Sequence, residues 1–303
     1  MVSPAAAVRI RSNASTVALT DIIGDAFYGD FVYETAKEWA GINFYATVWL
    51  SALYLVSIFS IDYLMRRKMA FDLQRPLAAW NFAQSLFSFL VIYHTIPTAI
   101  EEYMEDGLIG VQCNRACLRG SVGAWHFAFL ISKAFDLIDT YFIVLRKRPL
   151  IFLHYYHHVV TMNMGFYGYW RGWPGQPITI VNGSVHTIMY FYYGARALNW
   201  KVPGWVARTI TKLQIVQFVI ATAAGMHVLG IQLLGVDCLS WTIPEFAALA
   251  TLDLTFLYLF VDFFYKAYML NGGRDKYRDI AAKTFCVPDH APIAVNDFKS
   301  KSE

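Results

Sequence analysis

Charged side chains are scarce in this chain, and their scarcity excludes an ordinary soluble domain. Only 16% of the 303 residues are Asp, Glu, Lys or Arg, whereas 57% are hydrophobic. A soluble domain carries about a quarter charged residues. No long Lys/Arg tract with interleaved aromatic residues occurs, so we expect no nucleic-acid partner. Long apolar runs replace the missing charges, and they predict a polytopic membrane protein.

The N-terminus lacks the basic start and the apolar core of about 7–15 residues that a cleavable signal peptide shows. We therefore expect the first span to direct membrane insertion. Residues 1–40 are mixed and rather acidic, which predicts a tail with a short interfacial helix. Asn13-Ala14-Ser15 is a glycosylation sequon, so the tail is a candidate for a glycan.

Apolar runs of about 20 residues predict an all-α membrane domain at 41–269. We place its seven spans at 44–64, 78–98, 121–144, 150–170, 178–197, 210–233 and 244–267. Lys and Arg concentrate in one set of loops, which is therefore cytoplasmic. This orientation places the N-terminus in the lumen and the C-terminus in the cytosol. The cytoplasmic set holds Arg66, Arg67, Lys68, Arg75, Arg146, Lys147, Arg148, Arg196, Lys201, Arg208 and Lys212; the other set holds Arg115, Arg119 and Arg171.

Cysteine is also scarce, with four residues in the chain. None lies in a span near the histidines described below, which removes the usual thiol nucleophile from that region. The topology puts Cys113, Cys117 and Cys238 on the oxidising lumenal side. We expect Cys238 to form a disulfide with Cys113 or Cys117, joining two lumenal loops.

Three of the eight histidines lie within the segment 154–158. His154, His157 and His158 are spaced i, i+3 and i+4, which is one face of a helix. Their flanks are apolar on both sides. Ionisable side chains inside a membrane span are costly and mark functional sites. We therefore interpret this cluster as a site rather than as packing histidines, whereas His94, His126, His227 and His290 are assigned to packing or to the surface.

Three further polar clusters lie in the predicted spans: Lys133, Asp136, Asp139 and Thr140; Asn182, His186, Tyr190 and Tyr193; and Thr211, Gln214 and Gln217. The second cluster forms a stripe along one helix face. Given the topology, all of the clusters and the histidines share the cytosolic half of the membrane. We predict one polar chamber that opens to the cytosol. Lys133 and Asp136 can pair with each other, and either helix packing or substrate contact would explain them.

A metal site is one interpretation of the histidines, because imidazole binds iron and zinc. Membrane di-iron desaturases and hydroxylases also carry an HxxHH box, but they resemble one another in having several such boxes. Here only His154, His157, His158 and His186 share a depth, and no Glu-x-x-His pair occurs. We therefore predict no metal.

Metal-free acyl transfer is the alternative that we favour. Neutral imidazole is a nucleophile and a general base near pH 7, and a second His or Asn182 can donate to a developing oxyanion. A seven-helix receptor fits the topology, but it does not need three histidines on one cytosolic-side face. A transporter is disfavoured because no pair of Gly/Pro-broken spans suggests inverted repeats.

The four clusters, taken in order, resemble the signature motifs of the ELO family of very-long-chain fatty acid elongases. The matching segments are Lys133 to Thr140, His154 to His158, His186 to Tyr193 and Thr211 to Gln217, and the likeness covers about residues 40–270. One departure is Asp136, where the family usually has Glu; this puts a catalytic role for Asp136 in doubt. The residues 150–153, Leu-Ile-Phe-Leu, look like the saturated and monounsaturated branch.

The resemblance implies a 3-ketoacyl-CoA synthase with seven helices and an acyl tunnel, which condenses an acyl-CoA with malonyl-CoA. Our hypothesis is that His157 attacks the thioester with help from His186, while His154 and His158 transfer protons or stabilise an enolate. Asn182 and Gln214 would bind thioester or malonyl groups, and Tyr190 and Tyr193 would line the CoA approach. The remaining predicted substrate-binding residues are Lys133, Asp136, Asp139, Thr140 and Gln217.

The C-terminal tail, 270–303, is charged and is expected to be flexible and cytosolic. Lys299 and Lys301 resemble a dilysine retrieval signal, which predicts the endoplasmic-reticulum membrane. No cofactor is expected beyond the two CoA substrates. Membrane lipid is a partner, the reductase and dehydratase of the elongation cycle are candidate partners, and a homodimer is left open.

Overall fold

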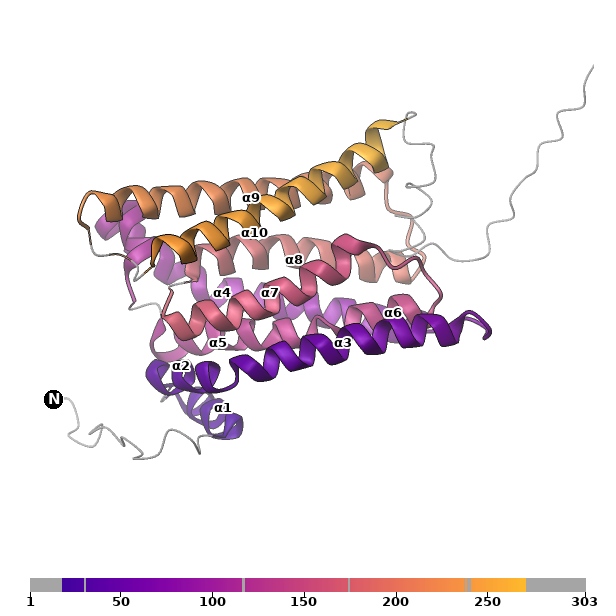
Figure 1. Ribbon diagram of the computed structural model, residues 1–303, viewed down its shortest axis with the longest axis horizontal. Coiled ribbons are helices and arrows are strands. Elements are labelled where there is room, and N and C mark those ends of the chain that lie inside the picture. The colour runs from indigo at the N-terminus through magenta and orange to yellow at the C-terminus, as the bar shows by residue number, and fades with distance from the viewer. Residues whose placement is uncertain are drawn as a thin grey trace, which may run out of the picture.

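The computed structural model describes residues 18–29, 31–115, 118–173, 175–236, 238 and 241–270. All regular structure within these ranges is helical, as the fold class predicts, and the long helices run side by side (Figure 1). The Asn13 sequon, Cys117, His290 and the Lys299/Lys301 signal lie outside the described residues. In chain order the helices are α1 (Leu19–Tyr28), α2 (Tyr33–Ile42), α3 (Phe44–Met65), α4 (Gln74–Cys113), α5 (Gly120–Phe135), α6 (Ile138–Leu145), α7 (Phe152–Arg171), α8 (Gln176–Ala197), α9 (Gly204–Leu233), α10 (Ile243–Phe264) and the π-helix η3 (Tyr265–Met269).

The helix expected at 121–144 is two helices, so the prediction of one continuous helix was wrong. α5 ends at Phe135 and α6 begins at Ile138. Across the break the backbone tightens, because the amides of Asp139 and Thr140 donate to the carbonyls three residues back, at 3.2 and 3.3 Å. Such short-range bonds are typical of helix ends.

Among the residues that the structure describes, four segments are long and apolar enough to cross a membrane: α3, α4, α9 and the run from Ile243 to Met269. They identify a membrane protein with several apolar helices. α5 and α6 are each shorter, with 16 and 8 residues. α7 and α8 carry the predicted polar clusters, which lower their hydropathy. α9 is one of the four apolar segments and also carries the predicted polar cluster Thr211, Gln214 and Gln217.

Local sequence explains where the site helices begin and end. α7 ends at Gly172, whose φ of 74° suits a residue without a side chain. α10 begins with a capping box between Thr242 and Glu245. The same Glu245 carboxylate accepts hydrogen bonds from the Tyr167 hydroxyl at 2.6 Å and from Arg171 Nε at 2.8 Å. The C-terminal end of α7 is therefore tied to the start of α10.

The most extensive helix pairing among the described residues joins α4 and α8. Gly194 makes this approach possible, because a Cβ there would lie 2.9–3.0 Å from the Phe82 ring. Ser85 adds a cross-helix hydrogen bond to the carbonyl of Thr187 at 2.8 Å. Small residues allow helix backbones to approach closely within membranes. α4 therefore packs closely against α8, the helix that carries His186.

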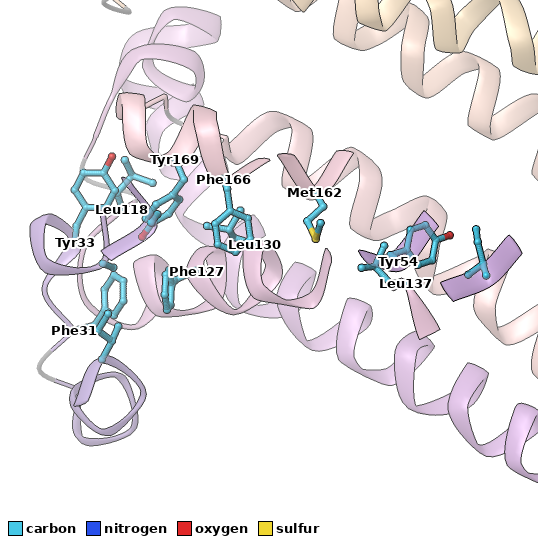
Figure 2. Close-up of a cluster of buried hydrophobic side chains, with 14 residues drawn as sticks. Phe31, Tyr33, Tyr54, Leu118, Phe127, Leu130, Leu137, Met162, Phe166 and Tyr169 are labelled. Carbon is cyan, nitrogen blue, oxygen red and sulfur yellow. The ribbon is translucent and has the colours of Figure 1, made fainter. Parts of the chain in front are cut away.

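The main apolar cluster joins the N-terminal helices to the bundle. Figure 2 shows Phe31, Tyr33 and Tyr169 at one end of this cluster and Tyr54 with Leu137 at the other. The segment 19–42, for which we expected a tail with one short helix, forms two helices that pack here. α1 and α2 lie at one end of the bundle (Figure 1).

A disulfide joins Cys113, at the end of α4, to Cys238, after α9. Of the two partners that the sequence left open for Cys238, the structure has Cys113. The two cysteines are 125 residues apart in sequence. The bond therefore links the ends of two long helices that are far apart in the chain.

Candidate active site

A cavity of about 560 Å³ lies between α4, α6, α7, α8, α9 and the C-terminal end of α10. His154, His157 and His158 from α7 line it, and His186 from α8 joins them. The structure therefore brings together the four histidines that the helical spacing and the topology had placed at one depth. We call this space the histidine cavity.

Seven more of the predicted site residues line the histidine cavity: Asp139, Asn182, Tyr190, Tyr193, Thr211, Gln214 and Gln217. Lys133, Asp136 and Thr140 are not among the lining residues. All three are buried. Lys133 contacts Asn182 and Thr140 contacts His154, and both of these partners line the cavity, whereas Asp136 contacts Lys133. The predicted set therefore divides into a lining layer and a supporting layer.

The histidines of α7 differ in their surroundings. The ring centroids of His154 and His158 are 4.4 Å apart, and those of His157 and His158 are 5.6 Å apart, with the rings edge to face. The ring of His157 also packs on Phe256 and Phe260, at 5.3 and 6.3 Å. His157 thus lies where the polar cluster meets an aromatic wall. Its ring therefore contacts both polar and apolar side chains.

A buried chain of polar contacts orients Asn182. Lys133 Nζ lies 3.2 Å from Asp136 Oδ2 and 3.2 Å from Asn182 Oδ1. Asn182 Nδ2 donates to Gln217 Oε1 at 3.1 Å, and Gln84 Nε2 donates to Asp136 Oδ1 at 2.7 Å. A buried charge is tolerable only when it is paired and hydrogen-bonded. The chain satisfies Lys133 and Asp136 and fixes which end of the Asn182 amide faces α9.

Asp139 is held in a similar way. Its carboxylate accepts a hydrogen bond from Trp80 Nε1 at 2.6 Å and another from the Tyr190 hydroxyl at 2.7 Å. Tyr190 also packs edge to face on His186, with centroids 5.3 Å apart. Asp139 therefore connects α4 to the α8 residue beside one of the site histidines.

The sequence analysis missed the contribution of α4. Trp80 and Gln84 support Asp139 and Asp136, and both belong to a span that we had treated as plain apolar helix. A signal was present in the sequence. Buried polar side chains recur along one face of this helix at i, i+3, i+4 and i+7, at Asn81, Gln84, Ser85 and Ser88.

The sequence analysis also missed Tyr54 of α3. Its hydroxyl lies 2.6 Å from Thr140 Oγ1, which in turn lies 3.0 Å from His154 Nε2. Tyr54 is only 1% exposed. A lone tyrosine in an apolar span gives no sequence signal, because nothing in the pattern shows which face is inward.

Three arginines from three elements line the histidine cavity: Arg146 after α6, Arg196 in α8 and Arg208 in α9. Lys147 instead donates to the carbonyl of Lys68 at 3.1 Å, in the loop after α3. Arginine binds phosphate through a planar fork of donors. The cavity therefore combines imidazoles with a cluster of fixed positive charge.

The other described histidines serve packing, as predicted. His94 stacks on Trp125 with centroids 4.6 Å apart, and His126 Nδ1 lies 3.2 Å from Thr179 Oγ1. His227 is hydrogen-bonded to Gln112. None of the three lines the histidine cavity. In the part of the chain that the structure describes, no group of three or more His, Cys, Asp or Glu is arranged to hold a metal ion.

Comparison with known proteins adds an independent observation. The model of the GNS1/SUR4 (ELO) family matches residues 39–276. Long chain fatty acid elongase 1 of Caenorhabditis elegans is 38% identical over 252 residues, covering 80% of this chain and 84% of the relative. Long chain fatty acid elongase 2 of the same organism is 41% identical, covering 71% and 80%. Very long chain fatty acid elongase 6 of Gallus gallus is 32% identical, covering 84% and 95%.

Proposed function

This chain belongs to the GNS1/SUR4 (ELO) family, and on that premise we propose that it is a fatty acid elongase that condenses a fatty acyl-CoA with malonyl-CoA. The products are a 3-ketoacyl-CoA two carbons longer, CO2 and CoA. The observation that carries the proposal is the histidine cavity, where imidazoles from α7 and α8 meet beside Asn182. Imidazole supplies the nucleophile and the base that acyl transfer needs.

The first step would be acylation of His157. A ring nitrogen of His157 attacks the thioester carbon, the new C–N bond forms and the C–S bond breaks. The proton that the ring carried passes to the CoA thiolate with help from His186. No thiol competes for this role among the described residues, because Cys113 and Cys238 are joined in the disulfide. A donor such as Asn182 would stabilise the oxyanion.

The second step would form the carbon–carbon bond. Malonyl-CoA loses CO2, and the electrons of the broken bond become an enolate. The enolate attacks the acyl carbon, the C–N bond to His157 breaks, and the departing imidazole nitrogen takes up one proton. His154 and His158 would stabilise the enolate oxygen. Gln214, whose amide now donates to Met189 Sδ at 3.2 Å, would bind the malonyl group.

The surroundings of the cavity support CoA thioesters as substrates. Arg146, Arg196 and Arg208 supply positive charge that complements the CoA phosphates. Tyr190 and Tyr193 would line the CoA approach. Ile151 and Leu153 also line the cavity, and we propose saturated or monounsaturated acyl chains as substrates.

We further propose that the chain crosses the endoplasmic-reticulum membrane seven times, with the N-terminus lumenal and the C-terminus cytosolic. α5 and α6 would together make one span, with α3, α4, α7, α8, α9 and α10 as the others. The basic loops support this orientation. The acyl chain would occupy a tunnel in the lumenal half of the bundle. The proposed chemistry uses no metal or cofactor, and the reductase and dehydratase of the elongation cycle would act on its product.

Intact-mass analysis of the purified protein with acyl-CoA alone tests the nucleophile. The wild type and His94→Ala, whose ring lies outside the cavity, should gain one acyl group, and His157→Ala should not. An undiminished adduct on His157→Ala would refute the assignment. Radiolabelled malonyl-CoA with a panel of acyl-CoAs tests the reaction itself. Labelled 3-ketoacyl-CoA formed in the presence of a strong chelator supports condensation, whereas loss of product that added iron or zinc restores supports the metal alternative.

A further inference from the structure

A chain of hydrogen bonds reaches His154 from α3, a helix that contributes nothing to the cavity lining. It runs from the Tyr54 hydroxyl to Thr140 Oγ1, at 2.6 Å, and from there to His154 Nε2, at 3.0 Å. Tyr54 is 1% exposed and Thr140 is fully buried. Figure 2 shows Tyr54 beside Leu137 at the end of the apolar cluster. Water therefore does not compete for these hydroxyls.

The number of protons in this chain decides their direction. Within the described part of the protein, the Tyr54 hydroxyl bonds only to Thr140, and the Thr140 hydroxyl bonds only to Tyr54 and His154. If Tyr54 donates to Thr140 and Thr140 donates to Nε2, each hydroxyl proton has an acceptor. If instead Nε2 carried the ring proton and donated to Thr140, one of the two hydroxyl protons would be buried without an acceptor. Because a buried hydroxyl proton without an acceptor is unfavourable, the first arrangement is favoured over the second by about tenfold or more.

We infer that Tyr54 and Thr140 are positioning residues that hold His154 with its proton on Nδ1. The inference deepens the proposed condensation and rests on it. His154 lines the cavity, and with Nε2 occupied by the threonine hydroxyl its remaining ring nitrogen is an N–H donor rather than a lone pair. A ring in that state is suited to stabilise an enolate or oxyanion and is not suited to attack a thioester.

The same argument separates His154 from His157. Within the described residues, no protein group is hydrogen-bonded to the ring of His157, whose neighbours are Phe256 and Phe260. Its ring nitrogens are therefore not committed to a protein partner. His154 and His157, one turn apart on α7, thus differ in their ring partners, and we assign them different roles for that reason.

The chain offers closely matched variants for the test. Thr140→Val removes the hydroxyl at nearly constant volume, whereas Thr140→Ser keeps it. Tyr54→Phe removes the outer hydroxyl, and Tyr141→Phe is its control. The Tyr141 ring contacts the Tyr54 ring at 6.2 Å, but its hydroxyl is bonded to Ser57 Oγ at 2.6 Å and not to Thr140.

We expect Thr140→Val to lower kcat for condensation about tenfold or more, with KM for both substrates changed by less than about twofold. Thr140→Ser should retain most of the kcat, Tyr54→Phe should lose several-fold, and Tyr141→Phe should match the wild type. The nitrogen-15 NMR spectrum of the histidine-labelled protein, with His154 assigned by His154→Gln, should show the Nδ1–H tautomer in the wild type. In Thr140→Val the spectrum should move toward Nε2–H.

Equal losses in Thr140→Val and Thr140→Ser would show that volume, not the hydroxyl, matters, and would overturn the inference. An Nε2–H tautomer in the wild type would overturn it as well, without any variant that might fold poorly. Failure of the proposed function is a separate outcome. In that case the wild type forms no 3-ketoacyl-CoA, while the NMR measurement, which needs no turnover, still decides the tautomer.

Discussion

Lys133 and Asp136 form a buried ion pair whose disruption should be costly. Their side chains are 11% and 6% exposed, and Lys133 also bonds to Asn182. Lys133→Met keeps the length of the stem and removes the ammonium, which leaves a buried carboxylate without its cation. Breaking a buried pair from one side costs about 3–5 kcal/mol. At roughly 2 °C per kcal/mol for a chain of this size, the melting temperature should fall by roughly 6–10 °C.

A double variant separates lost charge pairing from lost packing. Lys133→Met with Asp136→Asn removes both charges, and the side-chain amide that replaces the carboxylate can still accept the hydrogen bond from Gln84. The double variant should therefore recover most of the lost stability, as replaced ion pairs often do.

Thermal unfolding followed by tryptophan fluorescence, in one detergent and lipid mixture, measures this effect. Lys266→Met is the control, because its pair with Asp262 at 2.8 Å has side chains 37% and 32% exposed. Such a pair contributes about 1 kcal/mol or less. Two results would show that the pair is not desolvated. In the first, the melting temperature of Lys133→Met falls no further than that of Lys266→Met. In the second, the double variant loses as much stability as Lys133→Met and Asp136→Asn lose together.

Three further predictions concern the framework and the mouth of the cavity. Cys113→Ser should destabilise the chain by about 2–5 kcal/mol. The double variant Cys113→Ser with Cys238→Ser should lose no more stability than the single variant, because the same one disulfide is lost in both. Melting temperatures of the single and double variants check this. Gly194→Ala, at the close contact of α4 and α8, should lower the stability by about 1–3 kcal/mol. Gly230→Ala is the control and should not destabilise the chain, because nothing lies near a Cβ there. Equal melting temperatures of the two variants would contradict the close packing at Gly194. Arg208→Gln should raise KM for acyl-CoA several-fold and weaken its dependence on salt, with kcat nearly unchanged; a salt-independent KM in the wild type would argue against a phosphate contact.

Helical period and membrane depth explain why much of the site could be predicted. The spacing of His154, His157 and His158 fixes their common face, because a helix has one geometry wherever it lies. The loop charges predicted the direction of each span and hence a shared depth for His186 and Gln217. All of these residues line the histidine cavity.

The supporting layer could not be predicted in the same way. Trp80 and Tyr54 are isolated polar side chains in apolar helices, and the pattern does not distinguish an inward face from one that faces lipid. Of the four residues predicted within 133–140, only one lines the cavity. Asp139 lines it, while Thr140, the next residue, lies behind His154.

The sequence by itself determined that this is a helical membrane protein of the elongase family, and it predicted histidines as the reactive groups, because composition, period and motif order are local properties of the chain. Only the tertiary structure decided which hydroxyl meets which ring nitrogen, and that Lys133 bonds to Asn182. The physical reason is that a hydrogen bond depends on the packing of separate helices to within a few tenths of an ångström, and no spacing along one helix specifies that packing.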